Sequence, residues 1–182
     1  DSYLLNINYC KYFFQSCLHN SLDITNWLIE DYINNKKQLI SRKNIINLIK
    51  NKKIDALKLI EEKSIFKFDE KELFDLSCCF SQEIAAWLLS LNLFNLNLEK
   101  EQGLYNACMN QNIEVINWLI NLKCNYKYDN HLIFNECCKL KKLKTIKYLT
   151  SINKGYDYKM IIINNILITH IQIKAIILDN LN

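Results

Sequence analysis

Histidine and cysteine stand close together at two places in the sequence, and side chains of these types could do chemistry. The two groups are His19 with Cys10 and Cys17, and His131 with Cys124, Cys137 and Cys138. Thiolate and imidazole are the usual ligands of structural zinc, and a cysteine beside a histidine can act as a nucleophile. The first question is therefore whether the chain holds a metal ion or a reactive thiol.

The spacing of these residues favours neither role. The chain contains no Cys-x-x-Cys pair, so it matches no zinc-finger pattern. It also lacks a phosphate-binding glycine loop, a His-Glu-x-x-His motif and a nucleophile elbow. The cysteines fall instead beside other small residues at recurring positions, where a thiol behaves as a small apolar side chain. We therefore expect no catalysis, no metal ion and no cofactor.

The cysteine pattern and the apolar runs also bear on the compartment. The eight cysteines occur as adjacent pairs and singles, without the spacing of a disulfide framework, and the chain has no glycosylation sequon. Its longest apolar stretch runs from Met160 to Leu178. Two asparagines, His170 and Lys174 interrupt this stretch, so we expect a helix that does not cross a membrane. The prediction is a protein of the cytoplasm or of another reducing intracellular compartment.

The charge is weak evidence for an anionic partner. The net charge is +4, carried by 22 lysines and a single arginine, Arg42. Lysine and asparagine both have A/T-rich codons, so a low-GC genome explains their abundance without a functional cause. The sharpest basic feature is "KLKKLK", residues 139–144, which could contact phosphate or an acidic partner. Nucleic-acid binders usually carry a concentrated, arginine-rich face, so we expect a solvated surface and no nucleic-acid binding.

One pattern recurs along the whole chain at intervals of 28 to 32 residues. Its six copies are "LDITNWLI" at Leu22, "IDALKLI" at Ile54, "QEIAAWLL" at Gln82, "IEVINWLI" at Ile113, "LKTIKYLT" at Leu143 and "IQIKAIIL" at Ile171. A sustained period near thirty indicates an array of structural repeats. The repeats are assigned to residues 10–35, 42–69, 72–98, 103–129, 132–158 and 160–182, forming one domain over residues 1–182.

Each repeat reads as a helical hairpin. In the fourth copy, Ile113, Ile116 and Ile120 lie on one stripe of an amphipathic helix. Asn112 precedes this helix and is predicted to cap it, as Ser81 is in the third copy. A shorter apolar segment precedes most copies and ends in small residues ("FFQSC", "LFDLSC", "LYNAC", "FNECC"). Small side chains there let two antiparallel helices approach closely.

Aromatic residues recur in two further patterns. Apolar and polar residues alternate over 65–70, 93–98, 125–130 and 155–160, which predicts extended loops between the hairpins. The pairs Phe66/Phe68, Tyr126/Tyr128 and Tyr156/Tyr158 lie there, and one member of each pair could pack under the loop while the other contacts a partner. A second series, Trp27, Trp87, Trp118 and Tyr148, recurs within the second helices. A stacking ladder for a ligand is conceivable, but we expect core packing between neighbouring repeats.

Short helix, polar turn, longer helix and extended loop, in that order, resemble the ankyrin repeat. The stretch "LYNACMNQNIEVINWLINLKCNYKYD", residues 104–129, fits the family pattern L-x-x-A-A-x-x-G-x-x-E-V-V-x-x-L-L, and residues 13–29 and 73–91 fit it well. The Trp-Leu endings and the small-Cys pairs look most like the divergent ankyrin arrays of large DNA viruses of protists. The resemblance implies an all-α solenoid of about five to six helix-turn-helix repeats with extended inter-repeat loops, and for a viral protein a location in the host cell.

The sequence departs from the family pattern at the turns. No repeat has the Thr-Pro-Leu-His opening, and the glycine between the helices is replaced by Asn20, Lys53, Gln111 or Lys142. The departure affects the expected geometry of the loops and leaves the expected stacking of helices unchanged.

A repeat array offers a long concave surface in place of a single pocket, so we expect non-catalytic binding of another protein. By the resemblance, the contact residues lie on loop tips and first helices. They are Lys67, Asp69, Glu70, Asn95, Asn97, Met109, Asn110, Lys127, Asp129, Asn130 and Lys139. The alternative is a self-assembling component of a particle or filament, because the sixth repeat is unusually apolar for a terminal one.

Overall fold

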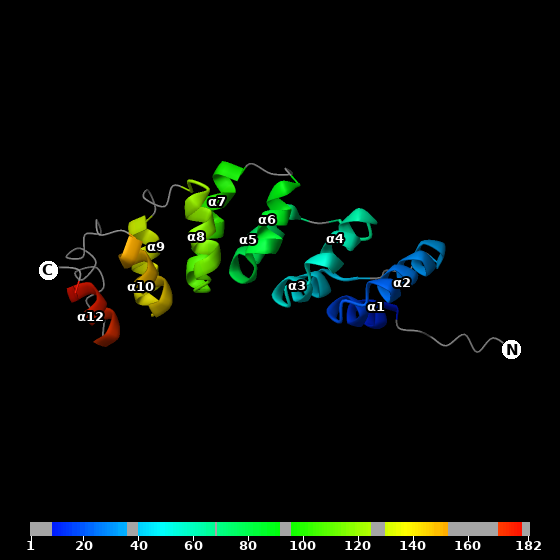
Figure 1. The fold of residues 1–182 in the computed structure, drawn as a ribbon, viewed down its shortest axis with the longest axis horizontal. Helices are drawn as coiled ribbons and strands as arrows, with labels where there is room; N and C mark the ends of the chain where they lie inside the picture. The colour runs from blue at the N-terminus through cyan, green and yellow to red at the C-terminus, as the bar shows by residue number, and fades with distance from the viewer. Residues whose placement is uncertain are drawn as a thin grey trace. The chain divides into compact units, whose positions relative to one another are not determined.

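All regular secondary structure in the described part of the chain is helical. The computed structural model describes residues 9–35, 40–67, 69–91, 96–124, 130–152 and 171–179. Within these ranges the chain forms helices and turns and no strand (Figure 1). The expected all-α class is therefore confirmed, while the ankyrin-like solenoid stays a prediction.

The chain divides into two compact units, residues 1–73 and residues 74–182. The N-terminal unit contains α1 (Tyr9–Leu18), α2 (Leu22–Asn35), α3 (Arg42–Lys50) and α4 (Ile54–Glu62), and α5 (Glu70–Phe80) begins in it. The C-terminal unit contains most of α5 and then α6 (Gln82–Ser90), α7 (Leu96–Met109), α8 (Ile113–Asn121), α9 (Asn130–Lys139), α10 (Leu143–Ile152) and α12 (Ile171–Asp179).

Helices adjacent in the sequence pack as hairpins, and like helices of consecutive hairpins pack on each other. In the N-terminal unit α1 contacts α2, α3 contacts α4, and the two first helices α1 and α3 touch. In the C-terminal unit α7 pairs with α8 and α9 pairs with α10. There the first helices α7 and α9 touch, and so do the successive second helices α6, α8, α10 and α12. The described helices thus follow the hairpin order expected from the sequence.

The core of four hairpins, those that begin with α1, α5, α7 and α9, combines one large residue with a small pair on the first helix. Phe13, Phe74, Leu104 and Phe134 are buried. The small pairs that follow them are buried as well, namely Ser16/Cys17, Ser77/Cys78, Ala107/Cys108 and Cys137/Cys138. The prediction that these thiols pack as small apolar groups is confirmed for these four pairs.

A pair of hydroxyl groups interrupts this apolar core in the first hairpin. Thr25 is buried on α2, with its Oγ1 at 2.9 Å from Ser16 Oγ on α1. The Ser16 hydroxyl donates to the carbonyl of Phe13 at 2.8 Å. Both hydroxyls are therefore satisfied inside the core, where an unpaired one would be costly.

Side chains cap the second helices where the sequence indicates. Ser81 Oγ accepts a hydrogen bond from Ile84 N–H at 3.3 Å, and Asn112 Oδ1 accepts one from Val115 N–H at 3.4 Å. Both predicted caps are confirmed. Each satisfies a backbone donor of the first turn that has no partner inside the helix.

The turn from first to second helix has the same left-handed conformation in four hairpins. Asn20, Lys52, Gln111 and Lys141 have φ of 56°, 56°, 58° and 57°. In each turn the left-handed residue and the residue after it donate their N–H groups to carbonyls of the last helical turn, as in a Schellman motif. Asn20 and Gln111 are two of the residues that replace the family's glycine, whereas in the other two turns the left-handed residue is the one before Lys53 and before Lys142. Adjacent lysines in both turns made the choice ambiguous.

Three segments expected to be extended loops run into helices. The prediction is wrong at Glu70 and at Asn130, where α5 and α9 begin, and the longest overlap lies in residues 93–98. The alternating pattern of residues 93–98 predicts extended backbone, but α7 begins at Leu96. Three alternating residues are compatible with either structure, and here the segment joins the long helix that follows. The extended-loop prediction is wrong for residues 96–98.

Gly103 lies where α7 approaches α5 closely. A Cβ built on Gly103 would lie 2.9 Å from Cys78 Sγ and 3.1 Å from Phe74 Cε1. Neither atom is the end of a long flexible side chain, so the neighbours cannot move away cheaply. The missing side chain is what allows these two helices to come this close.

The left-handed turns predict an increase in stability for Lys141→Gly. A non-glycine residue in this conformation costs about 1–2 kcal/mol, part of which glycine returns through its larger freedom in the unfolded chain. We expect the free energy of unfolding in urea to rise by up to about 1 kcal/mol. Lys147→Gly, at an exposed position inside α10, should lower it by about 1 kcal/mol. Equal losses in the two variants would contradict the prediction.

The close approach at Gly103 predicts that Gly103→Ala destabilises the fold. Replacing glycine by alanine inside a helix normally gains about 1 kcal/mol. Here the clash with Cys78 and Phe74 should outweigh that gain, since overpacking costs about 1–3 kcal/mol. In a Cys78→Ala background the nearest atom is gone, so the same substitution should cost less. Thermal and urea unfolding of the four chains would test this, and a Gly103→Ala chain as stable as the parent would refute it.

Candidate functional site

The tips between the first and second helices form the most regular exposed surface among the described residues. We call these tips the turn surface. Its members are His19 and Asn20, Asn51 and Lys52, Asn110 and Gln111, and Leu140 and Lys141. All except the half-buried Gln111 are exposed. Their backbone is held by the same pair of hydrogen bonds in every turn, while the side chains range from imidazole to amide, amine and aliphatic groups.

Side-chain amides tie these turns to neighbouring hairpins, Asn110 to the preceding one and Asn20 and Gln111 to the following one. In the C-terminal unit Asn110 Nδ2 donates to Cys79 Sγ at 3.0 Å, and Gln111 Oε1 accepts from the backbone N–H of Lys144 at 3.1 Å. In the N-terminal unit Asn20 Nδ2 donates to Asp55 Oδ2 at 3.3 Å. These bonds hold the tips in fixed positions. Sequence reasoning missed them, although polar residues separated by about one repeat were the available signal.

Two further bonds between hairpins lie along the second helices. Thr145 Oγ1 on α10 donates to the carbonyl of Cys108 on α7 at 2.9 Å. Tyr148 Oη donates to Asn117 Oδ1 on α8 at 2.9 Å. Burial raises the pKa of the Tyr148 phenol, which keeps the group protonated as a donor. Both contacts join α10 to the hairpin that precedes it.

The predicted contact residues of the N-terminal unit differ in their freedom to bind. Lys67 is exposed. Asp69 is exposed too, but its Oδ1 accepts the N–H of Glu72 at 3.0 Å, so it serves the start of α5. Glu70 is half-buried in the first turn of the same helix, where its charge favours the helix N-terminus. Of these three, Lys67 is the best placed for a partner.

In the C-terminal unit the structure brings three predicted contact residues onto two neighbouring helices. Met109 ends α7 and is half-buried, and Asn110 follows it in the exposed turn. Lys139 ends α9, which packs beside α7, and its Nζ lies 2.6 Å from Glu136 Oε1. The three therefore lie at the same end of two adjacent first helices, next to the turn surface.

The remaining predicted contact residues are outside what the structure tests. Asn95, Lys127 and Asp129 lie outside the described residues. Asn97 and Asn130 lie in α7 and α9, where the structure describes their backbone alone. Their role in binding stays a prediction.

The aromatic series of the second helices is less buried than expected. Trp87, Trp118 and Tyr148 are half-buried, and Trp27 is exposed. The prediction of a core position is wrong for Trp27, because burial at this position depends on a preceding hairpin. The described part of the N-terminal unit has none before α1.

The buried thiols are poorly suited to nucleophilic chemistry. Burial raises the pKa of Cys17 and of Cys138 to about 12, and it also raises the pKa of Cys78. Hydrogen bonding to Cys137, followed by burial, raises the pKa of Cys108. A reactive cysteine needs a lowered pKa, so these thiols have the opposite environment. Among the described residues, no three His, Cys, Asp or Glu side chains gather as metal ligands would.

The lysine cluster at residues 139–144 surrounds one tip of the turn surface. Lys141 and Lys144 are exposed there, and Lys142 is half-buried. Leu140, between Lys139 and Lys141 in the sequence, is 53% exposed. The tip is thus an aliphatic side chain with amines around it. Such a combination suits a protein partner with a small apolar contact and an acidic rim.

The chain matches no known family, no curated protein and no solved structure. None of the described helices is both long and apolar enough to span a bilayer.

The raised thiol pKa values predict a loss of stability at alkaline pH. The unfolded chain returns these thiols to an ordinary pKa near 9, so below that pH both states are protonated and the contribution is complete. As the pH rises from 9 towards 12, the unfolded state loses protons that the folded state keeps, and unfolding becomes easier. Each such thiol removes about 1.4 kcal/mol per pH unit.

Urea unfolding in reductant over this range would measure the effect, with Cys138→Ala as the comparison. Lysines and tyrosines titrate in both chains, so the difference in slope isolates one thiol. The variant should lose stability less steeply than the parent. Equal slopes would mean that Cys138 titrates in the folded state as it does in the unfolded chain.

Proposed function

We propose that the chain is a non-catalytic protein-binding module whose partner contacts the turn surface and the adjoining ends of the first helices. The proposal includes the ankyrin-like character of the array. The observation that carries it is a constant turn backbone with changing side chains. Left-handed turns with φ near 56–58° and the same hydrogen bonds present chemically different tips in four hairpins, those of α1/α2, α3/α4, α7/α8 and α9/α10.

A fixed frame with variable tips favours recognition for a physical reason. Ordering a flexible loop on binding costs free energy, and a turn already held by hydrogen bonds avoids much of that cost. The amide bonds of Asn20, Asn110 and Gln111 add to the rigidity of the turns. The side chains between these anchors then decide which partner fits.

Within the C-terminal unit, the tip at Leu140 is the strongest contact candidate. Its exposed aliphatic side chain is flanked by Lys139 and Lys141, and it follows α9, which packs beside α7, the helix that Met109 ends. Apolar centres with a charged rim are the usual anatomy of protein interfaces. We infer a partner with an acidic, partly apolar surface.

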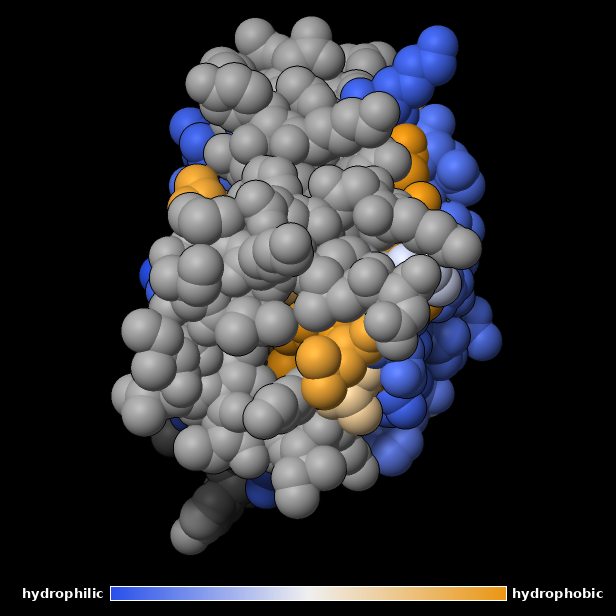
Figure 2. All heavy atoms as spheres, turned by 90° about the vertical axis from the view of Figure 1, so that its left-hand side faces the viewer, coloured by the Kyte–Doolittle hydropathy of each residue, from blue (hydrophilic) through white to orange (hydrophobic). Residues whose placement is uncertain are grey.

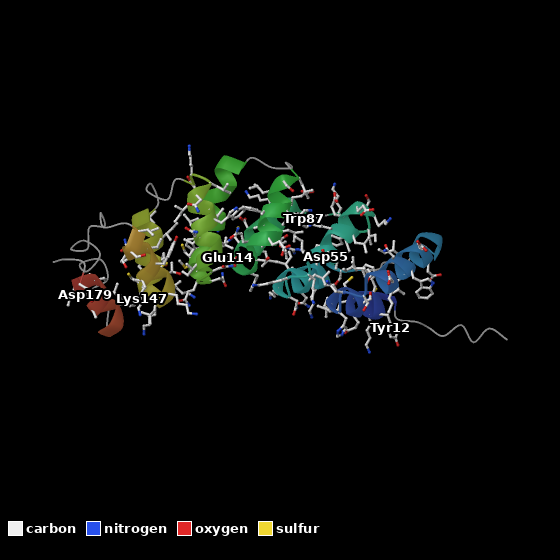
Figure 3. The ribbon with its side chains drawn as sticks, viewed as in Figure 1. Tyr12, Asp55, Trp87, Glu114, Lys147 and Asp179 are labelled. Carbon is white, nitrogen blue, oxygen red and sulfur yellow. The ribbon has the colours of Figure 1, made fainter. Side chains whose placement is uncertain are left out.

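Affinity capture with a matched pair of variants tests the proposal. Lys141→Glu reverses one charge in the turn surface, and Lys147→Glu makes the same change on the exposed side of α10 (Figure 3). A partner identified by mass spectrometry with the parent chain should bind at least about tenfold more weakly to Lys141→Glu, a loss of about 1.4 kcal/mol. Its affinity for Lys147→Glu should stay close to that for the parent.

Two controls make the result decisive. Far-UV circular dichroism and thermal melting of both variants should match the parent, because both side chains are exposed. A partner that loses affinity equally for both variants, or for neither, would show that binding uses another surface.

A further inference from the structure

Two positions of each second helix face the hairpin that precedes it in the chain. Counting from the first residue of the helix, these are the third and the sixth positions. In α10 they are Thr145 and Tyr148, whose hydroxyls donate to Cys108 O on α7 and to Asn117 Oδ1 on α8. Residues at these positions therefore normally meet another hairpin.

Burial at the third position shows the same rule in both units. Ala56, Val115, Thr145 and Ile173 occupy it in α4, α8, α10 and α12, and each is 0% exposed. In α2 the equivalent Ile24 is 54% exposed, and Trp27 at the sixth position is 59% exposed. These two apolar side chains occupy positions that contact a preceding hairpin in the other second helices, and the described residues include no hairpin before α1.

The first helix gives a third example. Eight residues before the left-handed turn residue, α7 has Gly103, which is buried against Cys78 and Phe74 of the preceding helix α5. At this position α1 has Tyr12, which is 55% exposed and projects from the helix (Figure 3). We call Tyr12, Ile24 and Trp27 the N-face.

The fifth and eighth positions of the second helix face the next hairpin. Asn117, fifth in α8, accepts the bond from Tyr148 on α10. Thr150, eighth in α10, is buried where α10 packs on α12. In α12 these positions are Ala175 and Leu178. Fifth-position residues stay exposed even where a hairpin follows, as Asn117 and Lys147 do, so the missing contact is seen at Leu178, which is 46% exposed where Thr150 is buried. We call Ala175 and Leu178 the C-face. Figure 2 shows that hydrophobic residues reach the surface on one face of the molecule.

The two faces are complementary halves of one kind of contact. Where α6 packs on α8, the fifth position is Ala86 and the sixth position of the following helix is Trp118. Ala175 and Trp27 have the same residue types at these two positions, which meet in the Asn117–Tyr148 bond between α8 and α10. We propose that the C-face of one copy of the chain stacks on the N-face of a second copy, as one more contact between hairpins.

The contact joins different surfaces of the two copies, so it leaves a free face at each end of the pair. Such heterologous association continues into longer assemblies or closes into a ring. It uses none of the turn surface, and it therefore stands or falls independently of the proposed partner binding.

Sedimentation of three single variants tests the proposal. Trp27→Lys places a charge on the N-face and Leu178→Lys places one on the C-face, while Leu140→Lys changes an equally exposed leucine of the turn surface. The average mass of the parent and of Leu140→Lys should rise with concentration from the micromolar towards the millimolar range. Trp27→Lys alone and Leu178→Lys alone should stay monomeric.

Mixing the two monomeric variants tests most directly whether the N-face and the C-face bind each other. Each retains the face that the other has lost, so an equimolar mixture should form a particle of twice the chain mass and grow no further. This recovery also shows that both variants are folded. A parent that stays monomeric, a Leu178→Lys variant that still associates, a mixture that does not pair, or loss of association in Leu140→Lys would each overturn the proposal.

Discussion

Contact between consecutive hairpins is the interaction on which the described structure depends. A hairpin of two short helices has apolar residues on more sides than its own two helices can cover, so each hairpin needs a neighbour. The third position of the second helix shows this directly, since it is fully buried wherever a hairpin precedes it. Polar bonds reinforce the same contact, with Thr145 and Tyr148 reaching back to the previous hairpin. Stability of this kind is shared between neighbours and is not a property of one hairpin.

The turns add a second constraint, because their backbone conformation does not depend on which side chain each tip exposes. Their hydrogen bonds lie in the backbone, so the side chain at each tip can change without loss of the turn. Lysine, glutamine and asparagine occupy left-handed positions that glycine would adopt without steric strain. The chain thus bears some conformational strain at positions where it displays different functional groups. This distribution supports the recognition proposed above. Cys17 and Cys138 are buried with raised pKa values, which disfavours their reaction as nucleophiles.

Much of this architecture could be predicted from the sequence, because its signals are local. The repeat period, the small pairs before four of the turns and the caps Ser81 and Asn112 all depend on residues close together in the chain. Exposure of Trp27 could not be predicted, since an identical pattern at Trp118 is half-buried beside α6. The helical start of α7 at Leu96 was missed because three alternating residues do not distinguish helix from extended chain. At the candidate site, the sequence located the helix ends of Met109 and Lys139, but the amide bonds that fix the turns required the structure.

The hydroxyl pair of Ser16 and Thr25 has a consequence for how similar hairpins avoid exchanging partners. Helices that resemble one another as closely as these could pair in the wrong order during folding, or swap between copies. At the position of Ser16, α3 has Leu48 and α7 has Ala107. If α2 packed on either of them, the Thr25 hydroxyl would lose its cross-helix partner inside the core. The hydroxyl would keep its local acceptor, the carbonyl of Ser21 at 3.0 Å, and would lose one hydrogen bond worth about 0.5–1.5 kcal/mol net. The Ser16–Thr25 bond thereby favours the pairing of α2 with α1 over its pairing with α3 or α7, which have no hydroxyl at this position.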